Sequence, residues 1–160
     1  PLEACIHGGG HEMGFRSGTL ATHQIVGLGA AAEICAQEME IESAQIGVLR
    51  DRLWAHIKQV PGSRLNGSLE CRSNSNLNVG FESVDGETLL LALDDVAVSS
   101  GSACTSASVE PSYVLKAIGV NEEIASSSIR FSLGRFTTLE DVDFAGQRVA
   151  EVVHKLRKVN

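Results

Sequence analysis

The sequence predicts an α+β fold in which a long N-terminal helix packs with a small, mostly antiparallel sheet and flanking helices. Three observations support this prediction. A helical repeat of apolar residues covers 20–60, short strands alternate with short helices after residue 61, and the chain closes with an amphipathic helix. We therefore divide a single region into an arm or loop (1–19), a long helical connection (20–60) and a small α+β domain (61–160).

The arm contains too many glycines for a helix or a sturdy strand. Its end, Arg-Ser-Gly-Thr at 16–19, is either an anion-binding turn or an ordinary helix N-cap, because hydroxyl and N–H groups at a helix start serve both purposes. His7 and His11 have the spacing of metal ligands on a helix. The triple glycine between them argues against a helix, and we predict no metal site.

The helical connection is either one long helix or two helices broken near Ser43 or Gly47. Pro61-Gly62 ends it. Cys35 and Trp54 fall in the apolar register, where core packing is expected. The apolar positions are Ile25, Leu28, Ala32, Cys35, Met39, Ile46, Leu49, Leu53, Trp54 and Ile57.

The small domain begins with a short strand at 64–66, a polar loop at 67–76 and an alternating strand at 77–81. Cys71 in that loop is interpreted as an incidental surface thiol. A helix over 88–93 then leads into a short strand at 96–99.

The second half of the domain contains a short helix at 113–118 closed by Gly119, followed by a turn of helix capped by Asn121. The strand at 127–133 alternates polar and apolar residues, with Arg130 on its polar side. Thr137 and Glu140 form a capping box that starts the terminal helix.

Between these two halves, Cys104 lies among small and hydroxylated residues. Ordering backbone costs about 1–2 kcal/mol per residue, and this segment has little apolar surface to offset that cost. We expect a loop that carries a reactive thiol. The alternative is a buried structural cysteine, since free cysteine is among the most buried residue types.

Composition excludes several classes of protein. The net charge of −7 argues against binding to nucleic acid or an anionic membrane, and no segment has the apolar length of a membrane span. The four cysteines form no CxxC pair, which favours reduced thiols in a cytoplasmic protein. Because the chain begins with Pro1, we expect a piece of something longer.

Four motifs, taken in order, resemble the NifS/IscS-type cysteine desulfurases of the class-V aminotransferase family. They are His-Gly-Gly-Gly-His-Glu (7–12), Arg-Ser-Gly-Thr (16–19), Ser-Ser-Gly-Ser-Ala-Cys-Thr-Ser-Ala-Ser (99–108) and Ser-Ile-Arg-Phe-Ser-Leu-Gly-Arg (128–135). The resemblance covers nearly the whole chain. It implies the C-terminal small domain of a fold that uses pyridoxal phosphate, and a homodimer that converts L-cysteine to L-alanine.

The resemblance also implies residue roles. Cys104 matches the cysteine that receives the sulfur as a persulfide, and Thr19 matches a hydroxyl that reaches the cofactor phosphate of the other subunit. Arg130 matches the arginine that holds the substrate carboxylate, a task suited to a planar bidentate donor. The implied partner is an iron–sulfur scaffold or another sulfur acceptor protein.

One part of the family pattern is missing. The lysine that forms a Schiff base with pyridoxal phosphate lies, in this family, upstream of the matched region. None of the four lysines follows that motif; they are Lys58, Lys116, Lys155 and Lys158. We therefore expect the C-terminal portion of a desulfurase, inactive alone. The alternatives are a stand-alone persulfide carrier or thiol sensor, and a dimerisation or scaffold-docking module.

Overall fold

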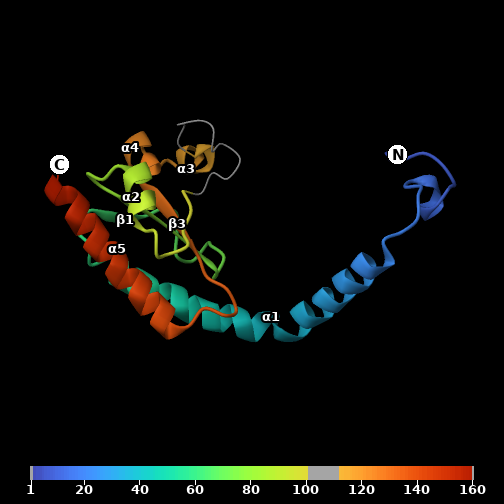
Figure 1. Ribbon diagram of the computed structural model, residues 1–160, viewed down its shortest axis with the longest axis horizontal. Helices are drawn as coiled ribbons and strands as arrows, with labels where there is room; N and C mark the ends of the chain where they lie inside the picture. The colour runs from blue at the N-terminus through green and yellow to red at the C-terminus, as the bar shows by residue number, and fades with distance from the viewer. Residues whose placement is uncertain (1, 101–111, 160) are drawn as a thin grey trace. The chain divides into compact units, whose positions relative to one another are not determined.

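The computed structural model describes residues 2–100 and 112–159 (Figure 1). By its internal contacts the chain divides into two compact units, Pro1–Met39 and Glu40–Asn160. Helix α1 (Thr22–Ile57) belongs to both and is continuous over 36 residues. Of the two possibilities for this segment, the unbroken helix is therefore confirmed.

The arm in the first unit folds back on itself. Ile6 and Arg16 form a parallel bridge, and a short 3₁₀ helix, η1 (Glu12–Gly14), lies between them. Ser17 is buried, and its hydroxyl accepts a hydrogen bond from the Gly10 amide at 3.2 Å. The arm is thus a closed loop held by the Ile6–Arg16 bridge and by the Ser17 hydroxyl.

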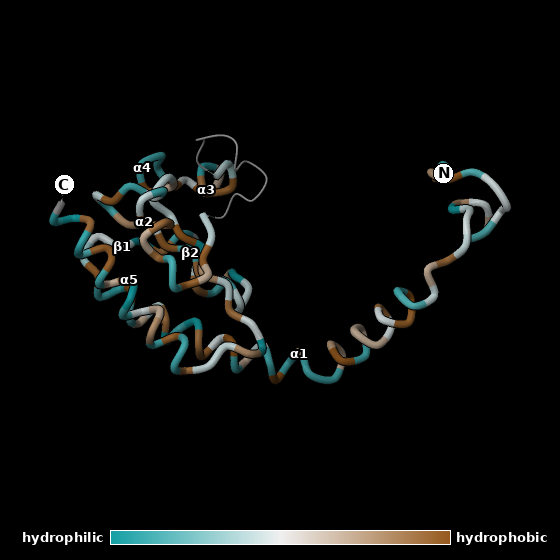
Figure 2. The backbone as a smooth tube through the Cα atoms, in the orientation of Figure 1, coloured by the Kyte–Doolittle hydropathy of each residue, from teal (hydrophilic) through white to brown (hydrophobic). Residues whose placement is uncertain are grey.

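The apolar residues in the first half of α1 are exposed, contrary to the prediction that they pack in a core. Cys35 is exposed, and so are Ile25, Leu28 and Met39, with Leu28 at 72%. Figure 2 shows the alternation of apolar and polar residues along this stretch. The first unit contains only the arm, η1 and this helix among its described residues. It therefore offers no sheet or second long helix to cover the apolar side.

The second unit is built on a three-stranded antiparallel sheet of order β1-β2-β3. The strands are β1 (Ser63–Leu65), β2 (Asn76–Phe81) and β3 (Ser128–Ser132). Val79 is opposite Ile129, and Asn78 is opposite Arg130. The predicted small antiparallel sheet is confirmed, with strand ends shifted by at most one residue.

One face of the sheet carries the core. Alternate residues of a strand point to the same face, and here the apolar ones pack with the second half of α1 and with α5 (Leu139–Val159). Trp54 packs at the edge of this cluster, as predicted. The fully buried members are Ile57, Leu77, Val79, Phe81, Leu89, Leu93, Ile129, Val142, Val149 and Val153.

Three short helices belong to the same unit, α2 (Gly86–Ala92), α3 (Tyr113–Ala117) and α4 (Glu122–Ser126) (Figure 1). Asn121 caps α4 through its side chain, which accepts from the Ile124 amide at 2.9 Å, as predicted. Gly80 allows α4 to approach the sheet, because a Cβ there would lie 2.4 Å from Ile124 Cγ2. The polar face of β2 and β3 therefore lies under α4 at one end.

Two local predictions are wrong. Residues 96–99 form no strand, since only Ser99 pairs, in an isolated bridge with Arg130. The capping box of α5 is formed by Thr138 and Asp141, whose side chains exchange hydrogen bonds with each other's amides. Thr137 is not available for that role, because its hydroxyl accepts from the Gly134 amide at 3.0 Å.

A cluster of charges joins α1 to α5. Arg52 donates two hydrogen bonds to the Asp143 carboxylate, at 2.6 and 2.7 Å, and His56 Nε2 lies 2.8 Å from the same group. These hydrogen bonds lower the pKa of Asp143 to about 2, and the bonds from Arg52 have a larger effect than the one from His56. Among the described residues, no helix combines the length and apolarity needed to cross a bilayer.

Candidate functional site

Arg130 lies in the middle of β3, on the sheet face opposite the core. Its strand neighbours Ile129 and Phe131 are buried in the core, so alternation directs Arg130 to the other side. Its amide donates to the Ser99 carbonyl at 2.6 Å, and its carbonyl accepts from the Ser99 amide at 3.2 Å. Both backbone polar groups of Arg130 are thus bonded to Ser99, while its neighbours Ile129 and Phe131 pair with β2.

The side chain of Arg130 lines a cavity of about 420 Å³. Polar residues of β2 and of the loop before it form one wall, and apolar residues of α3 form another. Ser100 and Ser112 also line it. These are the described residues on either side of 101–111, so the chain leaves and re-enters the described structure at this cavity. The remaining lining residues are Asn66, Gly67, Ser68, Cys71, Arg72, Asn76, Asn78, Val114, Leu115 and Ile118.

A network of hydrogen bonds holds the polar wall. Asn66 is 6% exposed, and its amide nitrogen donates to Asn78 Oδ1 at 2.6 Å and to Ser128 Oγ at 2.8 Å. Arg72 donates to the carbonyls of Ser68 and Asn66, both at 2.6 Å. The loop from 66 to 72 is therefore closed by its own last residue and fastened to two strands.

The described residues that line the cavity carry positive charge and no negative charge. Two guanidinium groups line it, those of Arg72 and Arg130, and no carboxylate does among the described residues. Burial, and then the charge of Arg50, lower the pKa of Arg72, although a guanidinium stays charged in a protein. Within the ranges 2–100 and 112–159, the Arg130 guanidinium forms no hydrogen bond or ion pair. The cavity can therefore receive a small anion.

The other two predicted site residues are placed differently. Thr19 is exposed in the unit Pro1–Met39, three residues before α1, and its carbonyl is approached by Arg16 Nη1 at 3.5 Å. Cys104 lies outside the described residues. Its role as the reactive thiol stays a prediction.

Sequence reasoning missed the residues that build the wall. It treated 67–76 as a polar loop and Cys71 as a surface thiol. Cys71 is indeed exposed, and it also lines the cavity. A signal was present in β2, where Asn76 and Asn78 alternate with apolar residues. This alternation places the two asparagines on the same sheet face as Arg130. Nothing in the spacing of Asn66 or Arg72 indicated that they close the wall.

The residues present do not fit a complete pyridoxal phosphate site. A Schiff-base lysine would have to reach the cavity, and none of the chain's lysines lines it among the described residues. All four side chains are exposed, and Lys116 lies 3.6 Å from Glu122 in an ion pair. They are Lys58, Lys116, Lys155 and Lys158. The arginine cavity can bind a carboxylate without providing the amine for that cofactor.

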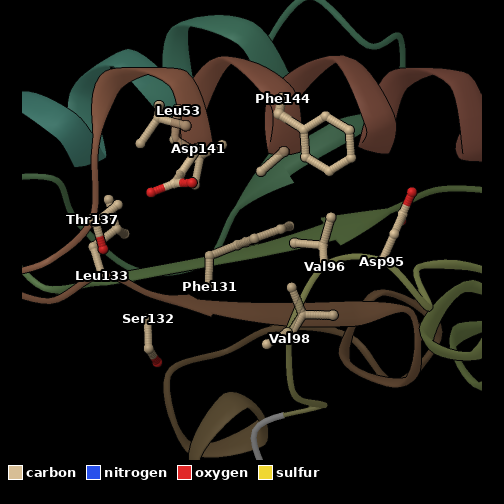
Figure 3. Close-up of a pocket in the computed structure, with 13 residues that line it drawn as sticks. Leu53, Asp95, Val96, Val98, Phe131, Ser132, Leu133, Thr137, Asp141 and Phe144 are labelled. Carbon is tan, nitrogen blue, oxygen red and sulfur yellow. The ribbon is translucent and has the colours of Figure 1, made fainter.

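A second cavity, of about 330 Å³, lies on the core side of the sheet (Figure 3). Leu53, Val96 and Phe131 give it an apolar lining. Its two carboxylates are engaged, Asp95 with Arg148 Nε at 2.8 and 3.0 Å and Asp141 in the α5 cap. None of the sequence-predicted site residues lines it, so the Arg130 cavity is the candidate site.

Comparisons with known proteins identify the family of this chain. The family model "Aminotransferase class-V" matches residues 5–144. Proteins named cysteine desulfurase IscS from Mannheimia succiniciproducens and Shewanella denitrificans are 59% and 58% identical over 99% of this chain. The chain spans about 39% of the length of these curated relatives.

Solved structures show the same fold. A NifS-like protein has a TM-score of 0.84 and 32% identity, over 98% of this chain and 40% of that one. A NifS-like protein from Rickettsia africae has a TM-score of 0.80 and 27% identity, over 95% of this chain and 40% of that one. The α+β architecture is therefore shared with proteins about two and a half times as long.

Proposed function

Since the chain belongs to the class-V aminotransferase family, we propose that it is the C-terminal part of a cysteine desulfurase that binds the substrate carboxylate and accepts its sulfur. One observation carries the proposal. An arginine whose guanidinium has no hydrogen bond or ion pair within the described residues lines a cavity, and the lining also includes Ser100 and Ser112, the described residues on either side of the range that contains Cys104. A carboxylate clamp and a thiol carried on the adjoining segment are the two groups that such a transfer needs from this part of the protein.

Each residue has a distinct role in the proposal. Arg130 holds the α-carboxylate of L-cysteine through two parallel N–H···O bonds, which fixes the position of the substrate sulfur. Cys104 forms the new S–S bond, while the C–S bond of the substrate breaks and its carbon takes a proton to give L-alanine. The hydroxyl of Thr19 donates a hydrogen bond to the cofactor phosphate of the other subunit.

The whole protein supplies what this chain lacks. Pyridoxal phosphate and its lysine would come from the remaining part, so this chain alone does not release alanine from cysteine. We propose that the whole protein is a cytoplasmic homodimer. It delivers the persulfide sulfur to an iron–sulfur scaffold or another acceptor protein, for cluster assembly and for thiolated cofactors.

The carboxylate clamp is tested by titrating the ¹⁵N-labelled chain with L-alanine and following the Nε–H resonances of arginine. We expect the Arg130 signal to shift and the Arg130→Met variant to bind at least about tenfold more weakly, because charge-assisted hydrogen bonds contribute about 1.5–3 kcal/mol. Arg64→Met is the matched control, since Arg64 on β1 pairs with Glu82 outside the cavity. Equal affinity in the two variants would exclude Arg130 as the clamp.

The thiol is tested by mass spectrometry after exposure to a small-molecule persulfide. We expect sulfur on Cys104 in preference to Cys35, which is exposed on α1 far along the chain from the cavity residues. Sulfur on Cys35 instead would exclude the proposed acceptor.

A visible spectrum separates this function from that of a stand-alone enzyme. We expect no internal aldimine band after pyridoxal phosphate is added to the chain. Such a band would show that one of the exposed lysines is competent after all. Concentration-dependent sedimentation tests the remaining alternative, a dimerisation module.

A further inference from the structure

The proposed function uses one of the two guanidinium groups of the cavity, and Arg72 is left over. It lies at the end of the loop from 66 to 72, whereas Arg130 lies on β3, so different elements present the two charges. The lining contains no carboxylate among the described residues that could neutralise either of them. A ligand with a single carboxylate would satisfy only one of them.

The geometry leaves Arg72 able to bind a ligand. Its bonds to the Ser68 and Asn66 carbonyls use Nε and one hydrogen of Nη2. A guanidinium has five N–H donors, so three remain. Gly67 turns the loop beside this group with φ +79°, a backbone conformation that favours glycine. The loop thus holds the guanidinium at the cavity wall without consuming its donors.

We propose that Arg72 is a selectivity residue of this cavity, which favours small acids carrying a second negative group beside the carboxylate that Arg130 holds. The proposal rests on the proposed function only in taking Arg130 as the carboxylate partner. For the substrate class above, the second group is the thiolate of cysteine. The product alanine lacks it. Arg72 therefore favours the substrate in its thiolate form over the product, which has no second negative group.

The same contacts give Arg72 a second, positioning effect. One of its hydrogen bonds, from Nη2, fixes the carbonyl of Asn66, whose side chain donates to Asn78 and Ser128. Loss of Arg72 would loosen this wall as well as remove a charge. The test must therefore distinguish the loss of the Arg72 charge from the loosening of the cavity wall.

The experiment compares two probes of equal length on the full chain, succinate with two carboxylates and butyrate with one. Isothermal or NMR titration gives the ratio of their dissociation constants for each variant. An exposed ion pair contributes about 0.2–1 kcal/mol, and a partly buried pair is screened less by salt, so the upper end of this range applies to the cavity. We therefore expect the unmodified chain to prefer succinate by about fivefold, since 1 kcal/mol is about a fivefold change.

Three variants decide the outcome. Arg72→Gln should lower the preference to about one, Arg72→Lys should restore most of it, and Arg64→Gln should leave it unchanged. The ratio is independent of the folded fraction, so a partly unfolded variant still reports selectivity. A preference retained in Arg72→Gln, or not restored by Arg72→Lys, would reduce Arg72 to a wall residue and overturn the proposal. Failure of the proposed function is read separately, from butyrate binding by Arg130→Met.

Discussion

Replacing Asn66 with alanine removes the side chain that ties the cavity loop to the sheet. The amide nitrogen of Asn66 makes two hydrogen bonds, to Asn78 Oδ1 at 2.6 Å and to Ser128 Oγ at 2.8 Å, and the residue is 6% exposed. The backbone contacts survive, since the Asn66 amide still donates to the Asn78 carbonyl at 3.0 Å. The loss is therefore confined to the side chain.

The expected cost follows from the partners left behind. Each hydrogen bond contributes about 0.5–1.5 kcal/mol net. Ser128 keeps its own bond to the Ile124 carbonyl at 2.5 Å, and half-buried Asn78 can be reached by water. We expect a loss of about 2 kcal/mol in the free energy of unfolding. For a chain of this length that corresponds to a fall in Tm of about 4–8 °C.

Fluorescence of Trp54 reports unfolding of the second compact unit, which contains Asn66. Trp54 is the only tryptophan in the sequence, and it packs against the core of that unit. Asn76→Ala is the matched control. Asn76 lines the same cavity, but its side chain makes no hydrogen bond with the described residues. The control should change the free energy by less than about 0.5 kcal/mol. Equal urea midpoints for the two variants would refute the network as a source of stability.

Two further predictions concern packing and charge. Gly86→Ala should cost about 3 kcal/mol or more in urea unfolding, because its Cβ would lie 1.9 Å from the Ser126 carbonyl oxygen, whereas Gly134→Ala, with open space around it, should be neutral. Asp143 has a folded-state pKa of about 2, below its unfolded value near 4, so its contribution is present above pH 4 and lost as the pH falls from about 4 to 2. Asp143→Asn should therefore be less stable than the unmodified chain at pH 7, and the difference in urea midpoint should shrink over that acidic range; a constant difference would contradict the assignment.

The elements that sequence predicted well are those with local signals. The cap of Asn121 and the turn at Gly119, which has φ +84°, both depend on residues within a few positions of the helix end. Strand β3 was recognisable because its alternation faces a core on one side only. These features need no knowledge of distant parts of the chain.

The errors arise where distant partners decide. The helical period identifies the apolar side of α1, but burial of Cys35 or Leu28 requires a surface to pack against, which their own unit lacks among its described residues. Thr137 and Thr138 are equally good caps by sequence, each with an acidic residue three positions on. The turn at Gly134 engages the first and leaves the second for the helix.

The site shows the same division. Arg130 was found through a motif, whereas Arg72 and Asn66 depend on a loop that folds back onto its own carbonyls. No period or spacing describes such a closure. Arg130 and the loop from 66 to 72 are far apart in the sequence and come together only in the folded structure, at the polar face of the sheet.

The single bridge between Ser99 and Arg130 has a consequence for measurement. The amide proton of Arg130 is protected by one acceptor, the carbonyl of Ser99, while Ile129 and Phe131 are opposite β2 residues within the sheet. The rate of deuterium uptake at the Arg130 amide therefore reports how often the hydrogen bond to Ser99 opens. The rates at the Ile129 and Phe131 amides report opening of the sheet itself. Hydrogen exchange at this one amide therefore measures how often Ser99, five residues before Cys104, separates from β3.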